Sequence, residues 1–121
     1  MIKYTKKFPK HVALSLKERE GLNYFAARLK GDLDNSLIEV KLYGSRARGD
    51  ARPNSDIDVL VVLKKDSERK KMAVYDRSVE TLRKYGVLLS EHIMNEKQYL
   101  YEKKLPSLFL QFVEREGISL L

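Results

Sequence analysis

LYGSRARGDARPNSDIDVLVV, residues 42–62, carries more structural information than any other part of the chain. An apolar run ends in Gly44 and Ser45, a loop rich in glycine and arginine follows, and Asp56 and Asp58 then open a second apolar run. A run this hydrophobic is typical of a strand that is covered on both faces. The pattern predicts two strands joined by a polar loop, with two carboxylates where the second strand begins.

These carboxylates are the first candidates for a functional site. Side chains alternate along a strand, so Asp56 and Asp58 are expected on one face, with their Cα atoms about 7 Å apart. Two carboxylates in this position repel each other and lose hydration unless a cation lies between them. Oxygen ligands in a chain without cysteine favour Mg²⁺ or Mn²⁺ over zinc. The sequence therefore predicts a divalent metal site at Asp56 and Asp58.

The loop before the aspartates has the groups that bind phosphate. Gly44 and Gly49 allow close backbone approach and positive φ. Backbone N–H groups, the Ser45 hydroxyl and the guanidinium groups of Arg46 and Arg48 can donate hydrogen bonds to a triphosphate. The alternative for either arginine is that it faces solvent, because two arginines that lie two residues apart need not both face one ligand. Metal-binding and phosphate-binding groups are thus expected within reach of one loop.

The spacing of the two aspartates alone is weak evidence, and the chain contains its own control. Asp32 and Asp34 have the same spacing, but they lie in a polar segment, residues 31–36, that predicts a solvent-exposed turn. The second pair is distinguished by Gly44-Ser45, which precede it by ten intervening residues, and by the basic loop between them. The apolar strand that follows completes the pattern.

Helical and strand patterns alternate along the rest of the chain. Ser15-x-x-Glu18 is a capping box that opens a helix predicted to end at Gly31. Alternation in residues 37–43 predicts a strand with Ile38, Val40 and Leu42 facing inward. The remaining expected elements are a helix over 67–85, a strand over 87–94, helices over 95–104 and 107–115, and an edge strand over 118–121.

The predicted helix over residues 67–85 is amphipathic. Its apolar side chains recur at helical spacing and are expected to pack on the sheet: Met72, Tyr75, Val79, Leu82 and Tyr85. Because strands and helices alternate, the fold class predicted is a small α/β (α+β) sandwich, with a mixed β-sheet packed against helices.

Composition bounds the remaining possibilities. The 121 residues are expected to form a single domain over 1–121, with residues 1–13 as an arm or a short strand. No segment has the apolar length of a membrane span and the basic N-terminus lacks a signal-peptide core, so we expect no membrane association and a cytoplasmic protein. The absence of cysteine excludes disulfides, thiolate zinc sites and cysteine nucleophiles. The net charge of +7 favours anionic partners such as nucleotides or nucleic acid.

Gly44-Ser45, ten intervening residues and Asp56-x-Asp58 resemble the signature of the DNA polymerase β-type nucleotidyltransferase superfamily, specifically its minimal nucleotidyltransferases. The resemblance implies a compact nucleotidyltransferase core with these motifs on adjacent elements. It implies that Gly44 and Ser45 hold the terminal phosphates and that Asp56 and Asp58 bind Mg²⁺ or Mn²⁺. The family usually adds a third carboxylate from a neighbouring strand. Here the candidate is Glu91, as a third ligand or base, and the alternative is that Glu91 is a surface charge.

The same resemblance implies a reaction and a partner. The expected reaction moves a nucleoside monophosphate, AMP from ATP, to a hydroxyl and releases pyrophosphate. Minimal nucleotidyltransferases act as antitoxins beside a HEPN-type toxin, so a HEPN-type partner protein is the expected acceptor. Two other readings stay open: a non-catalytic subunit that binds nucleotide or protein, and, ranked third, a basic nucleic-acid-binding protein. A homo-oligomer is compatible with each of them.

Overall fold

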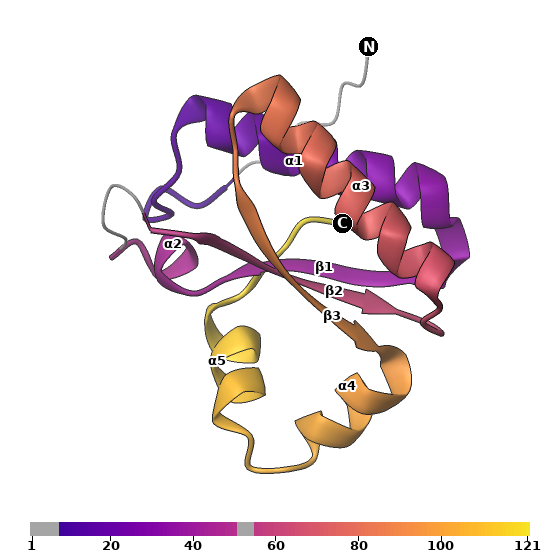
Figure 1. The fold of residues 1–121 in the computed structure, drawn as a ribbon. Coiled ribbons are helices and arrows are strands. Elements are labelled where there is room, and N and C mark those ends of the chain that lie inside the picture. Colours follow the sequence, from indigo (N-terminus) through magenta and orange to yellow (C-terminus); the bar gives the residue numbers. More distant parts are fainter. Residues whose placement is uncertain (1–7, 51–54) are drawn as a thin grey trace.

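The computed structural model describes residues 8–50 and 55–121, which form one mixed sheet with helices on both of its faces (Figure 1). The strands are β1 (Leu37–Tyr43), β2 (Ile57–Leu63), β3 (Leu89–Asn95) and β4 (Ile118–Ser119), in the order β3-β2-β1-β4. β1 pairs antiparallel with β2 and with β4, whereas β2 and β3 are parallel. The parallel pair requires a crossover, which helix α3 (Glu68–Tyr85) provides. The predicted mixed sheet with helices is confirmed.

β2 is the central strand, and its side chains alternate between two separate cores. Val59, Val61 and Leu63 belong to the larger core on one face of the sheet. Leu60 and Val62 belong to the smaller core on the other face. All five are fully buried, and burying a side chain of this size stabilises the fold by roughly 1.5–3 kcal/mol. The prediction that this strand is covered on both faces is confirmed.

Helices α1 (Leu16–Leu33) and α3 cover the face that carries the larger core (Figure 1). Ser15 and Glu18 form the predicted capping box at the start of α1. The apolar stripe of α1 is buried as expected and consists of Leu22, Phe25, Ala26, Leu29 and Leu33. The two helices are also joined by polar contacts, because Arg77 of α3 forms an ion pair with Asp32 and Tyr24 donates a hydrogen bond to Glu80 at 2.6 Å.

Helices α4 (Glu96–Lys103) and α5 (Leu108–Glu116) cover the opposite face (Figure 1). Asn95 and Ser107 cap their N-termini by accepting backbone hydrogen bonds from Gln98 and Leu110. Tyr99, Leu110 and Val113 close the smaller core against β2. The chain then returns to the sheet through β4 at the edge beside β1, where the sequence predicts an edge strand.

Three local expectations are wrong. α1 does not end at Gly31 but continues to Leu33, and a 3-10 helix, η1 (Asp34–Ser36), leads into β1. Within β1 the register shifts between Leu37 and Glu39. This irregularity turns Ile38 toward the smaller core, while Val40 and Leu42 face the larger one. A bulge of this kind changes which face a side chain occupies and is not visible in an alternating sequence pattern.

The third wrong expectation concerns α3, which turns its large apolar side chains away from the sheet. Its buried residues are the smaller Val74, Ser78 and Thr81. Met72, Tyr75, Val79 and Leu82 are 53%, 43%, 47% and 42% exposed, respectively. Tyr85 is half-buried and packs at the edge of the larger core.

Residues 8–15 pack on the molecule rather than extending from it. Val12 is buried in the larger core, and Phe8 and Leu14 pack against that core. Ala13 donates a backbone hydrogen bond to the carbonyl of Arg46 at 2.9 Å. The part of the predicted arm in residues 1–7 lies outside the described residues.

Candidate active site

The pairing of β1 with β2 brings the Gly44 turn against Asp58. Tyr43, the last residue of β1, is opposite Asp58 in the antiparallel ladder, so the next residue along the chain turns directly beside that carboxylate. Gly44 has φ 80° and ψ −159°, a region that is essentially restricted to glycine. A Cβ atom at Gly44 would lie 2.6 Å from Asp58 Oδ2. Only a residue without a side chain allows the turn to pass this close to the carboxylate.

The electrostatics of the pair fit a cation. Burial raises the pKa of Asp58, the negative charge of Asp56 raises it further, and the positive charge of Arg48 lowers it. The pKa of Tyr43 is also raised, first by burial and then by the charge of Asp58. An exposed carboxylate beside a half-buried one is a suitable pair of ligands for Mg²⁺ or Mn²⁺. Residues 8–50 and 55–121 contain no group of three or more side chains arranged as a metal site, so the structure supplies two carboxylates.

Ser45 follows Gly44 and begins the short helix α2 (Ser45–Arg48), a helical turn within the loop that the sequence does not predict. The Ser45 carbonyl accepts hydrogen bonds from the backbone N–H groups of Gly49 at 2.9 Å and Asp50 at 3.2 Å. Its side chain is half-buried. Gly44 and Ser45 are therefore brought together with Asp58, as expected from the sequence.

Arg46 is not placed to bind phosphate. It is 8% exposed, and its guanidinium donates hydrogen bonds to the carbonyls of Ser55 and Ala13 at 2.9 and 3.1 Å. It also forms an ion pair with Glu18 at 2.9 Å. These bonds join the start of β2, the N-terminal segment and the first turn of α1. Arg46 is thus a structural residue of the loop, and its expected role as a ligand of the nucleotide is corrected here.

Arg48 is the exposed arginine of the loop. Its side chain is 42% exposed and forms ion pairs with Asp50 at 3.2 Å and with Glu116 of α5 at 3.0 Å. Its positive charge lowers the pKa of Asp58. The side chain of Asp50 is 64% exposed and that of Glu116 is 19% exposed, so the ion pair with Asp50 is the one that a phosphate could replace at little cost in free energy.

Glu91 lies on the opposite face of the sheet from Asp58. In the parallel pairing of β2 with β3, Ser90 is the neighbour of Asp58, whereas Glu91 is the neighbour of Val59. Glu91 accepts a hydrogen bond from the Ser78 hydroxyl of α3 at 3.0 Å, on the face that carries the larger core. A change of one residue in register moves a side chain to the other face. We therefore correct the expected role of Glu91 as a third ligand or base.

An aromatic group on the same face as Asp58 is missed by the sequence reasoning. Phe109 of α5 contacts Tyr43 edge-on, with ring centroids 5.3 Å apart, and stacks on His92 with centroids 4.9 Å apart. His92 is the neighbour of Leu60 in the pairing of β2 with β3, one step further along the face from Ser90. The sequence offers only a weak signal for this group. Ser90, Glu91 and His92 are polar residues in the middle of β3, which is the next strand after the buried β2. Of these rings, Tyr43 lies directly opposite Asp58 in the pairing of β1 with β2.

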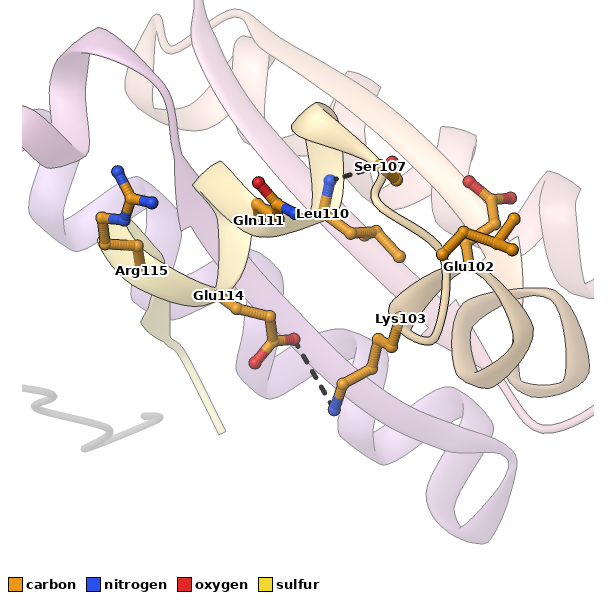
Figure 2. A pocket seen from close by; sticks show the side chains of 8 residues that line it. Glu102, Lys103, Ser107, Leu110, Gln111, Glu114 and Arg115 are labelled. Atoms are coloured by element: carbon orange, nitrogen blue, oxygen red, sulfur yellow. Dashed lines mark hydrogen bonds and ion pairs between the residues drawn. The ribbon is translucent and has the colours of Figure 1, made fainter.

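A cavity of about 420 Å³ lies between α4 and α5, apart from the aspartates (Figure 2). Glu114 is the main charged group in its wall and accepts hydrogen bonds from Tyr99 and Lys41, and it forms an ion pair with Lys103. Burial raises the pKa of Glu114, but Tyr99 and the two lysines lower it more, so the pKa lies below its ordinary value of 4.5. No residue of the carboxylate site lines this cavity.

The fold and the site together define a class of enzyme that handles nucleotides, and the comparisons with known proteins name it. The family model described as "Nucleotidyltransferase domain" matches residues 19–117. The chain belongs to this family and is an enzyme of the nucleotidyltransferase class. The resemblance drawn from Gly44-Ser45 and the two aspartates is thereby confirmed.

Particular relatives make the relationship more specific. The chain is 32% identical over 102 residues to "Putative protein adenylyltransferase MJ0604" of Methanocaldococcus jannaschii, covering 84% of this chain and 96% of that protein. Its fold is similar to that of spectinomycin adenyltransferase AAD(9) from Enterococcus faecialis, solved with ATP and spectinomycin. The TM-score is 0.65 at 20% identity, over 84% of this chain and 55% of AAD(9). A mutant of the toxin–antitoxin MntA–HpeT has a similar fold, with a TM-score of 0.53 at 16% identity over 82% of this chain and 72% of the other.

In the part of the chain that the structure describes, no helix is both long enough and apolar enough to cross a membrane.

Proposed function

We propose that this chain transfers AMP from ATP to a hydroxyl group on a partner protein, in a reaction that depends on Mg²⁺ or Mn²⁺ and releases pyrophosphate. The observation that carries the proposal is the contact between the Gly44 turn and the Asp58 carboxylate, since a Cβ at Gly44 would lie 2.6 Å from Asp58 Oδ2. A glycine turn beside the Asp58 carboxylate supports binding of a phosphate and a divalent ion next to each other. The similarity to a protein named as an adenylyltransferase supports AMP as the transferred group.

Asp56 and Asp58 would hold the metal ion, and Gly44 and Ser45 would hold the terminal phosphates. A bound divalent ion supplies neutralisation of the charge that develops on the phosphates during transfer. Arg48 contributes a second positive charge, after exchanging its ion pair with Asp50 for a phosphate oxygen. Arg46 acts indirectly, because it holds the loop and the start of β2 in place.

A partner protein is proposed as the acceptor, and a HEPN-type toxin is the expected partner. The motif resemblance to minimal nucleotidyltransferases, which act as antitoxins, supports this choice. The fold similarity to the toxin–antitoxin MntA–HpeT agrees with it. The acceptor would be a hydroxyl, such as that of a tyrosine, presented to the exposed side of Asp56.

Transfer of label from α-³²P-ATP to the protein encoded beside this chain tests the proposal. We expect labelling in the presence of Mg²⁺ and its loss in the double variant Asp56→Asn/Asp58→Asn. The matched control is Asp34→Asn/Asp76→Asn, which makes the same change of charge at two exposed carboxylates outside the site. Thermal unfolding of both variants verifies that they are folded.

Each outcome decides between the hypotheses. Labelling that survives in the Asp56→Asn/Asp58→Asn variant contradicts the roles proposed for these residues. Neutralisation of a toxic partner by this variant, without labelling, supports instead a subunit that acts by binding alone. Affinity for RNA that falls steeply with salt and does not depend on nucleotide favours the nucleic-acid-binding alternative.

A further inference from the structure

The outer surface of α3 carries an apolar stripe that the fold leaves uncovered. The stripe consists of Met72, Tyr75, Val79 and Leu82, which are 42% to 53% exposed. These residues recur at intervals of three and four, so they form one continuous face of the helix. The inner face of α3 is already packed on α1 and the sheet through smaller residues. A continuous apolar surface of this kind is typical of a binding surface.

The spacing of the stripe is symmetric about the middle of the helix. Met72 and Leu82 each lie five residues from Arg77, and Tyr75 and Val79 each lie two residues from it. If a second copy of α3 packs against the first in the antiparallel direction, Met72 meets Leu82 of the other copy and Tyr75 meets Val79. A two-fold symmetric interface requires this kind of self-complementarity, in which one surface matches itself after rotation.

The two ends of the stripe bear on the direction of the pairing. Glu68 precedes Met72 by four residues and Arg83 follows Val79 by four, so each continues the stripe at one end, and both are exposed. In the antiparallel arrangement, Glu68 of one copy lies within about one helical turn of Arg83 of the other. Arg69 is also exposed and comes near the same Arg83, so the attraction to Glu68 is partly offset by this like charge. The N-terminus of each helix also meets the C-terminus of its neighbour, which is favourable for the helix dipoles. A parallel arrangement would place like charges together.

We propose that this stripe, Met72, Tyr75, Val79 and Leu82, is a two-fold homodimer interface in which α3 packs antiparallel against α3 of a second copy of the chain. The proposal does not depend on the proposed function. The stripe lies over the face opposite to Asp58, so the dimer leaves both candidate active sites open. One pair of helices buries less than a standard interface of about 1,600 Å², so we expect a weak dimer, to be sought at about 10–500 μM protein.

Sedimentation of the full chain over this range of concentration measures the association. We expect a monomer–dimer equilibrium and an increase of about tenfold or more in the dissociation constant for Val79→Glu, because the interface would bury an unpaired charge. The control is Leu100→Glu on α4. Leu100 is 49% exposed and Val79 is 47% exposed, but Leu100 lies on the other side of the sheet. Activity and thermal unfolding of the two variants are expected to match those of the wild type.

Cysteine cross-linking tests the direction of the helices, because the chain has no cysteine of its own. Met72→Cys and Leu82→Cys chains, mixed and oxidised, are expected to form a disulfide between chains. Either variant alone is not, since the two equivalent positions would lie about 15 Å apart, beyond the reach of a disulfide. Glu68→Lys and Arg83→Glu are each expected to weaken the dimer, and the double variant is expected to restore it.

Three results overturn the proposal. The first is a wild-type chain that stays monomeric throughout the concentration range. The second is cross-linking of Met72→Cys or Leu82→Cys alone with the efficiency of the mixture, which indicates parallel or unspecific contact. The third is a monomeric chain whose Val79→Glu variant loses binding of a different protein, which assigns the stripe to that partner.

Discussion

Replacing Gly44 with alanine tests whether the turn is built around the carboxylate of Asp58. Gly44 occupies φ 80° and ψ −159°, and holding another residue in this region costs on the order of 1–3 kcal/mol. The added Cβ would also lie 2.6 Å from Asp58 Oδ2, a contact that forces the carboxylate or the turn to move. Overpacking adds about 1–3 kcal/mol, so we expect Gly44→Ala to destabilise the fold by about 2–6 kcal/mol.

Gly86 provides a matched control for the backbone effect. It ends α3 with φ 68° and ψ 24°, and a Cβ atom there has no atom within 4 Å. Gly86→Ala is therefore expected to lower the free energy of unfolding by only about 1–2 kcal/mol, which is the cost of a left-handed conformation for residues other than glycine. Because Gly86 lies far along the chain from the site, activity per folded molecule is expected to be unchanged in this variant.

Urea unfolding and the AMP-transfer assay measure the two effects separately. We expect Gly44→Ala to lose activity by at least about tenfold, since the displaced Asp58 no longer faces the phosphates. In an Asp58→Ala background the clash disappears, so the cost of Gly44→Ala falls and the two substitutions show a coupling of more than about 0.5 kcal/mol. Equal costs in both backgrounds, or full activity in Gly44→Ala, would refute the reasoning.

Four further predictions concern single side chains. Arg46→Ala is expected to lower the free energy of unfolding by about 2–4 kcal/mol, because it leaves buried carbonyls and a carboxylate without their donor. Urea unfolding measures this loss. Arg46→Lys is expected to be destabilised as well, because lysine lacks the planar guanidinium. Arg48→Ala should leave the midpoint of thermal unfolding unchanged and raise the KM for ATP. Glu91→Gln should retain AMP transfer. A loss of about a hundredfold in the rate of transfer would indicate that Glu91 acts in the active site after all. Glu114 has a folded-state pKa below 4.5. The wild type is therefore expected to have a higher free energy of unfolding than Glu114→Gln at pH 7, and this difference is expected to disappear as the pH falls through the lowered pKa.

Local patterns predicted the parts of the fold that depend on neighbouring residues. The capping box of Ser15 and Glu18 and the doubly covered strand β2 are both present. Gly44 and Asp58 also meet as expected, because a strand that ends at the turn and a strand that begins at the aspartates must pair in register for both to be buried. Hydrophobic alternation therefore positions this half of the site.

The remaining half depends on register and on partners far along the chain. Glu91 was expected beside Asp58, but the pairing of β2 with β3 places Ser90 there instead. An error of one residue is invisible in a strand whose polar residues are consecutive. Arg46 and Arg48 look equivalent in the sequence. Arg46 is buried because it bonds Glu18 and the Ser55 carbonyl, which only the folded chain brings close to it.

The apolar stripe of α3 shows why hydrophobic periodicity predicts a helix more reliably than it predicts what the helix packs against. Periodicity requires only that one face be covered, and it does not state whether the cover is the same chain or another molecule. In α3 the side that packs on the sheet is made of Val74, Ser78 and Thr81, and Ser78 is occupied in bonding Glu91. Large side chains on that side would separate α3 from the sheet and break this bond. The exposed stripe thus follows from the small, partly polar side chains of the inner face of α3.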